Sequence, residues 1–168
     1  MKYLCIIQAR LGSSRFPNKV MQTVGGIPMV KRVWLAAKYA GMSMQYTKYQ
    51  YKVVVAWPER YPELNQNNVL DRFRKLINEY KPEYVIRLTA DCPLLNSQDI
   101  YKAILEFEKY PRYYSNHKDG HDVQIFDPWV KQPWDREHVI ADFTTISTGL
   151  SVNTKEDLER VRRIANGR

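Results

Sequence analysis

Short apolar runs and amphipathic stretches alternate along the first part of the chain. Residues 3–7 are apolar at every position, as expected for a strand that is covered on both faces of a sheet. Residues 52–57, with three valines at their centre, and residues 84–89 are predicted to be the second and third strands. Apolar residues three or four positions apart predict helices over residues 28–39 and 69–80. This order predicts a parallel α/β sheet with right-handed crossovers.

Glycine and proline mark the ends of the predicted helices. Gly25 and Gly26 form a turn, Pro28 follows at the start of the first helix, and Gly41 is expected to end it. Pro82 stops the second helix. The apolar stripes of the two helices comprise Met29, Val30, Val33, Trp34, Ala37, Leu70, Phe73, Leu76 and Ile77.

Further elements are predicted in the second half of the chain. Residues 96–99, Asn-Ser-Gln-Asp, have the composition of a helix start, and this helix extends to about Lys109. Residues 111–114 are expected to be a loop, and a short strand follows Asp122. The last strand and helix lie within residues 151–161.

The stretch from Gln8 to Met21, which follows the first strand, carries the first chemical signal. Between Arg10 and Lys19 it holds three cations, two hydroxyls, one glycine and one proline, and no acid. Such a loop suits a polyphosphate, because Gly12 lets the backbone approach closely while the cations neutralise charge. The Walker and dinucleotide glycine patterns are both absent. The alternative is a solvated basic turn after an edge strand.

A second chemical signal lies at the end of the third strand. By strand alternation, Arg87, Thr89 and Asp91 point to one face of the sheet. Because parallel sheets bind ligands beyond the carboxyl ends of their strands, Asp91 is expected beside the loop that begins at Gln8. Mg²⁺ is held by one or two carboxylates plus substrate phosphates, so Asp91 is a candidate metal ligand. The alternatives are a turn residue or a salt-bridge partner of Arg87.

The net charge of +8 is unevenly distributed. Residues 1–60 carry ten Lys or Arg against one acid, whereas residues 61–168 carry sixteen against seventeen. The basic part contains the loop described above, where an anionic ligand would be attracted. Charge alone does not separate a nucleotide from a nucleic acid.

Length and composition limit the classes of protein to which this chain can belong. The 168 residues are expected to form one domain, residues 1–168. No apolar run approaches the roughly 20 residues of a membrane span, so we expect a cytoplasmic protein without a membrane partner. Cys5 and Cys92 are expected to be reduced core residues. The Lys-Asp-Gly between His117 and His121 argues against a helix that would bring both to one zinc ion.

Five segments, in this order, resemble the boxes of the sugar-acid cytidylyltransferases. Residues 9–19 resemble Ala-Arg-x-Gly-Ser-x-Arg-x-Pro-x-Lys, and residues 87–94 resemble Arg-x-Thr-Gly-Asp-Cys-Pro-Leu. Residues 119–126 are similar to Asp-Gly-x-Asp-Val-Glu-x-Phe, residues 136–139 match Arg-Glu-His-Val, and residues 152–158 are similar to Val-Asp-Thr-Pro-Glu-Asp-Leu. The nearest resemblance is to the spore-coat polysaccharide biosynthesis protein F branch.

The resemblance implies a fold and an activity. The fold would be a three-layer α/β/α arrangement with a mostly parallel sheet, of the nucleotide-diphospho-sugar transferase type, which is glycosyltransferase-A-like and Rossmann-like. The activity would be transfer of CMP from CTP to a sugar or sugar acid for polysaccharide or glycan synthesis, with Mg²⁺ as cofactor and pyrophosphate as product. A homodimer is compatible with the family, and nucleic acid is not an expected partner.

The resemblance also implies roles for individual residues. The catalytic set would be Arg10, Arg15 and Lys19, which hold the phosphates and the leaving pyrophosphate, and Asp91, which holds the metal together with Asn153. The nucleotide-binding set would comprise Gln8, Ala9, Arg10, Gly12, Ser13, Ser14, Arg15, Lys19, Arg87 and Asp91.

Two further residues are candidates for the sugar site. Asp122 fits the sugar site or a position beside the metal ligands, and equally fits a turn before a short strand. His138 fits a residue that orients the sugar, but such a histidine is more often a capped, partly buried structural residue.

The chain departs from the family pattern at several points. Ala90 replaces a glycine, and Asn153 replaces the second metal-binding aspartate. Asn can coordinate Mg²⁺ through its carbonyl oxygen, but Asn153 is also a preferred helix N-cap, with Glu156 placed to complete a capping box. The segments 57–68 and 139–151 are shorter than in the family. A nucleotide-binding remnant without turnover and a basic nucleic-acid-binding module are therefore the alternative functions.

Overall fold

A five-stranded sheet forms the centre of the computed structural model, which describes residues 1–45, 50–58, 69–109, 113–115, 123–129 and 150–167. Its strands are β1 (Tyr3–Gln8), β4 (Tyr51–Ala56), β5 (Tyr84–Thr89), β6 (Tyr113–Ser115) and β7 (Val123–Phe126). Their order is β4-β1-β5-β7-β6. The predicted parallel arrangement is confirmed for β4, β1 and β5, whereas β7 pairs with β5, and β6 with β7, in antiparallel fashion.

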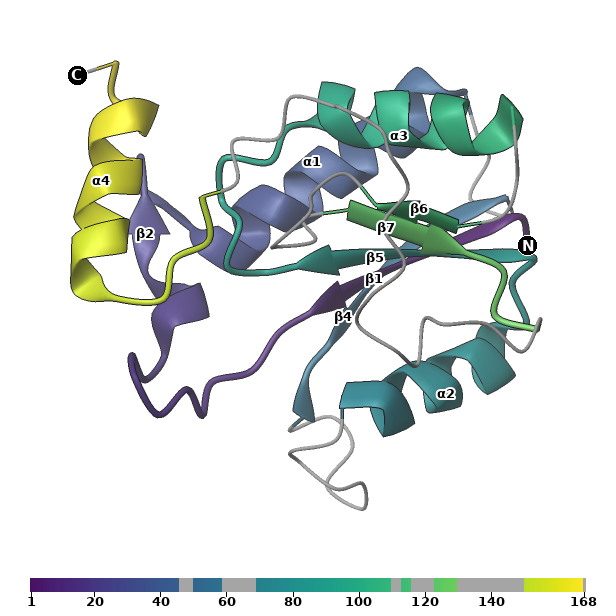
Figure 1. Cartoon of the computed structure of the whole chain (residues 1–168), viewed down its shortest axis with the longest axis horizontal. Helices are drawn as coiled ribbons and strands as arrows, with labels where there is room; N and C mark the ends of the chain where they lie inside the picture. The colour runs from purple at the N-terminus through teal and green to yellow at the C-terminus, as the bar shows by residue number, and fades with distance from the viewer. Residues whose placement is uncertain (46–49, 59–68, 110–112, 116–122, 130–149, 168) are drawn as a thin grey trace.

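Helices cover both faces of this sheet and make three layers (Figure 1). They are α1 (Met29–Ser43) and α3 (Ser97–Lys109) on one face and α2 (Val69–Tyr80) on the other. Along β1, Tyr3, Cys5 and Ile7 belong to the core on the α1 and α3 side, and Leu4 and Ile6 to the core on the α2 side. The prediction of a strand covered on both faces is confirmed. Among the described helices, none is long and apolar enough to cross a membrane.

Helix α1 continues past Gly41 to Ser43, so the prediction that Gly41 ends this helix is wrong. A Cβ atom at position 41 would lie 2.4 to 2.9 Å from three atoms of the Tyr51 ring. The Tyr51 hydroxyl in turn donates a hydrogen bond of 2.9 Å to the carbonyl oxygen of Ala37. Glycine is therefore required here for close packing of a helix against a strand, and not as a helix terminator.

Gly41→Ala is expected to lower the free energy of unfolding. Overpacking of this kind costs about 1–3 kcal/mol, which exceeds the gain of up to about 1 kcal/mol from helix propensity. Urea denaturation measures the difference. Gly12→Ala is the control, because a Cβ atom at Gly12 would meet no other atom within 4 Å. Equal stability of wild type and Gly41→Ala would contradict the packing argument.

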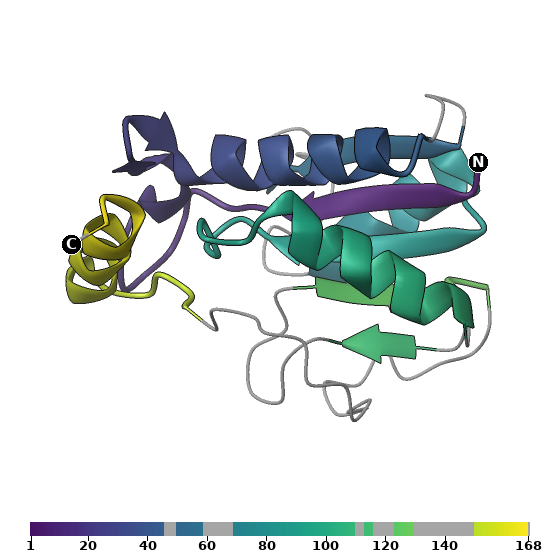
Figure 2. The same cartoon turned by 90° about the horizontal axis from the view of Figure 1, so that it is seen from above.

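The C-terminal helix α4 lies at the end of the molecule beside a small hairpin (Figures 1 and 2). These elements are α4 (Lys155–Ala165), β2 (Thr23–Val24) and β3 (Ile27–Pro28). Leu158 and Val161 of α4 share an apolar cluster with Val24 of the hairpin and with Phe16. Because Phe16 belongs to the basic loop, the C-terminal segment helps to hold that loop in place.

Two further predictions differ from the structure. Residues 113–115 form a strand instead of a loop, because Tyr113 pairs with Phe126 across a long-range contact that no local pattern reveals. Residues 151–153 do not form a strand. Instead, the backbone N–H of Val152 donates a hydrogen bond of 2.8 Å to the carbonyl oxygen of Asp91, which brings this segment to the end of β5.

Both cysteines are buried and form no disulfide with each other, as predicted. Burial raises the pKa of the Cys5 thiol from 9.0 to about 12. This thiol is therefore protonated at neutral pH and acts as a small apolar core group.

Candidate active site

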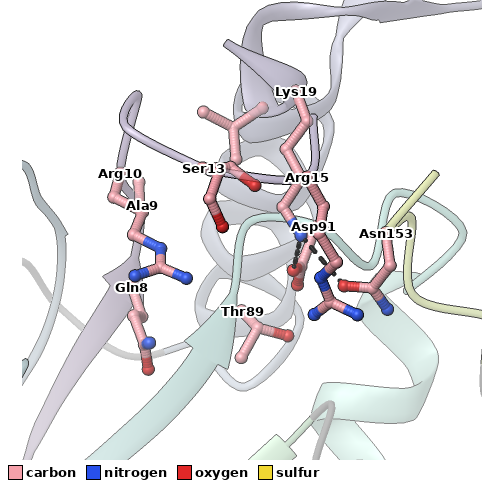
Figure 3. A pocket seen from close by; sticks show the side chains of 11 residues that line it. Gln8, Ala9, Arg10, Ser13, Arg15, Lys19, Thr89, Asp91 and Asn153 are labelled. Atoms are coloured by element: carbon pink, nitrogen blue, oxygen red, sulfur yellow. Dashed lines mark hydrogen bonds and ion pairs between the residues drawn. The ribbon is translucent and has the colours of Figure 1, made fainter. Parts of the chain in front are cut away.

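A pocket of about 190 Å³ opens at the carboxyl ends of β1 and β5 (Figure 3). Gln8 and Thr89, the last residues of these strands, are register partners, and the N–H of Ala90 donates to the carbonyl oxygen of Gln8 at 3.0 Å. This pairing confirms that Asp91 stands beside the basic loop. The lining residues are Gln8, Ala9, Arg10, Ser13, Ser14, Arg15, Lys19, Val20, Thr89, Asp91 and Asn153.

The ammonium group of Lys19 is surrounded by oxygen atoms from distant parts of the chain. Its Nζ lies 2.6 Å from Asp91 Oδ2, 2.9 Å from the Val152 carbonyl oxygen and 3.2 Å from Asn153 Oδ1 (Figure 3). The Lys19 side chain is 9% exposed and that of Asp91 is 25% exposed, so water screens this ion pair only in part. Lys19, predicted to hold phosphate, is thus paired with both predicted metal ligands. The salt bridge of Asp91 is with Lys19 and not with Arg87.

Asn153 faces the pocket because its neighbours fix its amide. Its Nδ2 donates to Ser151 Oγ at 2.9 Å, which directs Oδ1 toward Lys19. The helix cap is the next residue, Thr154, whose hydroxyl accepts from the N–H of Asp157 at 3.2 Å. The reading of Asn153 as N-cap with a Glu156 capping box is therefore wrong by one residue. Asn153 is left facing the site.

Asp157 completes this capping box, and Asp157→Asn is expected to lower the free energy of unfolding more at neutral than at acid pH. Hydrogen bonds from the backbone N–H of Asn153, then of Thr154, hold the pKa of the Asp157 carboxyl below 3.8. A carboxylate whose native pKa is lowered stabilises the fold fully above its unfolded-state pKa. That stabilisation is lost as the pH falls through the native pKa.

Urea denaturation of both proteins at neutral pH and at about pH 2 tests this prediction. Glu159→Gln is the control, because Glu159 is 63% exposed and its ion pair within the described part of the chain is with Arg162, one helical turn away. Such a surface pair contributes little at either pH. An equal cost of Asp157→Asn at both pH values would contradict the assignment.

The basic loop presents its arginines to the pocket. Arg10 and Arg15 line it and are exposed, as is Ser14. Ser13 is buried, and its hydroxyl accepts a hydrogen bond of 3.4 Å from the N–H of Phe16, so it also stabilises the loop. Gly12 is exposed and is not among the lining residues, and apart from its two chain neighbours no atom of the described residues lies within 4 Å of the place where a Cβ atom would stand.

Arg87, predicted to bind nucleotide, is not among the lining residues. Its guanidinium donates to the side-chain oxygens of Gln8 and Gln124. Thr89 and Val20 do line the pocket, although they were not in the predicted set. The alternation of β5 places Thr89 with Asp91 and was the signal for it; no sequence signal pointed to Val20.

The two candidate sugar-site residues, Asp122 and His138, lie outside the described residues, as do His117 and His121. Within the described ranges, no group of three or more His, Cys, Asp or Glu side chains is placed to hold a metal ion. From the described residues, a metal in the pocket would find one carboxylate together with amide and carbonyl oxygens, beside groups of the substrate.

Comparison with known proteins identifies the family of this chain. The model of the family described as "Cytidylyltransferase" matches residues 4–56 and 62–161. This chain belongs to the cytidylyltransferase family. Members of the family are nucleotidyltransferase enzymes, and the predicted family resemblance is confirmed at this level. The spore-coat branch stays a prediction.

Individual relatives agree with the family assignment. The 8-amino-3,8-dideoxy-manno-octulosonate cytidylyltransferase of Shewanella sp. (strain ANA-3) is 27% identical over 177 residues, which cover 93% of this chain and 70% of the relative.

Solved structures confirm the predicted nucleotide-sugar transferase fold. A cytidylyltransferase from Leptospira borgpetersenii serovar Hardjo-bovis (strain JB197) aligns with a TM-score of 0.73 at 20% identity, covering 100% of this chain and 88% of that one. A CMP:2-keto-3-deoxy-manno-octonic acid synthetase complexed with CTP aligns with a TM-score of 0.63 at 14% identity, covering 99% of each chain.

Proposed function

We propose that this protein transfers CMP from CTP to a sugar acid, with release of pyrophosphate, in the synthesis of a glycan. The observation that carries the proposal is one pocket in which the family's cationic loop meets Asp91 and Asn153. The relative and the neighbouring structure described above act on octulosonate-type sugar acids, and the latter was solved with CTP. Both support a sugar acid as the acceptor.

The reaction is a displacement at the α-phosphorus of CTP. The acceptor hydroxyl oxygen forms a bond to that phosphorus, the bond to the β-phosphate oxygen breaks, and the hydroxyl proton is released to water. Such transfers depend on positioning and on charge neutralisation more than on covalent participation of the protein. Arg10 and Arg15 would bind the triphosphate and stabilise the pyrophosphate as it leaves.

The oxygens around Lys19 also fit a divalent cation. Asp91 Oδ2, the Val152 carbonyl oxygen and Asn153 Oδ1 already converge on one positive group. Carboxylate, carbonyl and amide oxygens are the ligand types that Mg²⁺ takes alongside substrate phosphates. Asp91 and Asn153 would therefore hold Mg²⁺. When bound, Mg²⁺ would supply Lewis-acid polarisation of a phosphoryl oxygen.

A thermal-shift panel of the four nucleoside triphosphates, each with and without Mg²⁺, tests the binding part of the proposal. CTP with Mg²⁺ is expected to raise the melting temperature most, because at equal concentration the ligand that binds the native state most tightly stabilises it most. An assay of pyrophosphate release, with CTP, Mg²⁺ and an octulosonate-type sugar acid, tests whether the protein turns over. Equal shifts for all four triphosphates would overturn cytidine specificity, and CTP binding without release would favour the nucleotide-binding remnant.

A further inference from the structure

Three polar side chains form a row across neighbouring strands beside the pocket. Gln8 ends β1, Arg87 lies in β5, and Gln124 lies in β7 directly opposite Arg87 in the register. Within their strands these residues alternate with side chains of the other face, and they share the face of Ile6 and Val85, which pack with α2. The row therefore lies on the face of the sheet that α2 covers. It reaches the pocket at Gln8, which is a lining residue.

The guanidinium of Arg87 bridges the two amides. Its Nε and Nη2 donate to Gln8 Oε1 at 3.0 and 2.8 Å, and its Nη1 donates to Gln124 Oε1. A guanidinium has only donors, so each glutamine must turn its carbonyl oxygen toward Arg87. The hydrogen bonds from Arg87 therefore select one of the two orientations of the Gln8 amide. In this orientation the NH₂ group of Gln8 points away from Arg87.

The two glutamines differ in their surroundings. Gln124 is 6% exposed and is not a lining residue, whereas Gln8 is half-buried and lines the pocket on the side opposite Lys19 and Asn153 (Figure 3). On this side Arg10 lies beside Gln8, and Gln8 and Thr89 add uncharged hydrogen-bonding groups (Figure 3). A fixed amide donor at this position discriminates between acceptors and donors of a bound substrate.

We infer that Gln8 donates its amide N–H to a hydrogen-bond acceptor of a bound substrate, and that Arg87 is a positioning residue that fixes this orientation. The acceptor belongs either to CTP or to the sugar acid. The inference rests on the proposed function, and it assigns to Arg87 a role that acts through Gln8 and involves no direct contact with phosphate.

Gln8→Glu and Gln124→Glu are the matched test. Each replaces an amide with a carboxylate of the same shape, and Arg87 can bind either carboxylate, so both proteins should fold. Only Gln8→Glu removes an N–H donor from the pocket. It is expected to raise the KM for CTP or for the sugar acid about tenfold or more. Gln124→Glu should leave both KM values within about twofold of wild type, and glutamate is the residue of the resembled family motif at that position.

A second pair of variants tests the role of Arg87. Arg87→Lys is expected to raise the KM of the same substrate by a smaller factor, because an ammonium lacks the rigid planar fork with which the guanidinium holds both amides. In a Gln8→Met background, Arg87→Lys should add no further change in that KM. If Arg87 only stabilised the sheet, Arg87→Lys would instead lower the melting temperature and leave the KM values unchanged.

The outcomes separate this inference from the proposed function. A rise in the KM for CTP alone places the acceptor on the nucleotide, and a rise in the KM for the sugar acid alone places it on the sugar acid; either supports the inference. Equal KM values in Gln8→Glu, Gln124→Glu and wild type overturn it while the proposed function stands. A wild-type protein that releases no pyrophosphate overturns the proposed function instead.

Discussion

Asp91→Asn is expected to reduce the rate of pyrophosphate release by roughly 100-fold or more, the scale on which loss of one preorganised electrostatic group acts. Asp91 is the only acid among the described residues that line the pocket, and its carboxylate is held at 2.6 Å by Lys19. Asparagine keeps the size of the side chain and removes its charge. A steady-state assay with CTP and an octulosonate-type sugar acid measures the effect, which should appear mainly in kcat.

The control for this prediction is Asp71→Asn. Asp71 lies on α2 in an exposed pair with Arg74 at 3.4 Å and is not a lining residue, so this variant should retain wild-type turnover. Increasing the Mg²⁺ concentration should partly restore Asp91→Asn if weakened metal binding causes the defect. Full activity of Asp91→Asn at low Mg²⁺ would contradict the assigned role.

Lys19→Met is expected to lower both turnover and stability. The variant leaves the carboxylate of Asp91 and two neutral oxygens without their shared cation. Loss of a buried partner of this kind costs about 1–3 kcal/mol of the free energy of unfolding. Turnover should fall on the order of 100-fold, because a charge that balances the phosphates and Asp91 is lost. Urea denaturation and the pyrophosphate assay measure the two effects.

A double-mutant cycle separates these effects. In Lys19→Met with Asp91→Asn, no unpaired carboxylate is left, so the double variant should be more stable than the sum of the single variants predicts. Its turnover should not recover, because both charged groups are absent. Additive stabilities would mean that the 2.6 Å ion pair contributes nothing to the fold.

The sequence identified the two halves of the site for reasons that are local. The strand before Gln8 and the strand before Asp91 have recognisable patterns, and in a parallel sheet their carboxyl ends meet. The partner of Lys19 was beyond such reasoning, because Asp91 is 72 positions away and the Val152 carbonyl 133 positions away. The sequence likewise placed a cap at Asn153, where the structure uses Thr154 and leaves Asn153 facing the pocket.

The sequence by itself determined the family, the parallel half of the sheet and the residues of the basic loop. These depend on local spacing and on ordered motifs, which are present in the linear chain. Only the tertiary structure shows why Gly41 is a glycine, that α4 packs against Phe16, and that Arg87 donates hydrogen bonds to Gln8 instead of lining the pocket. Each of these depends on a contact between distant residues, and such contacts form only when packing brings their side chains together.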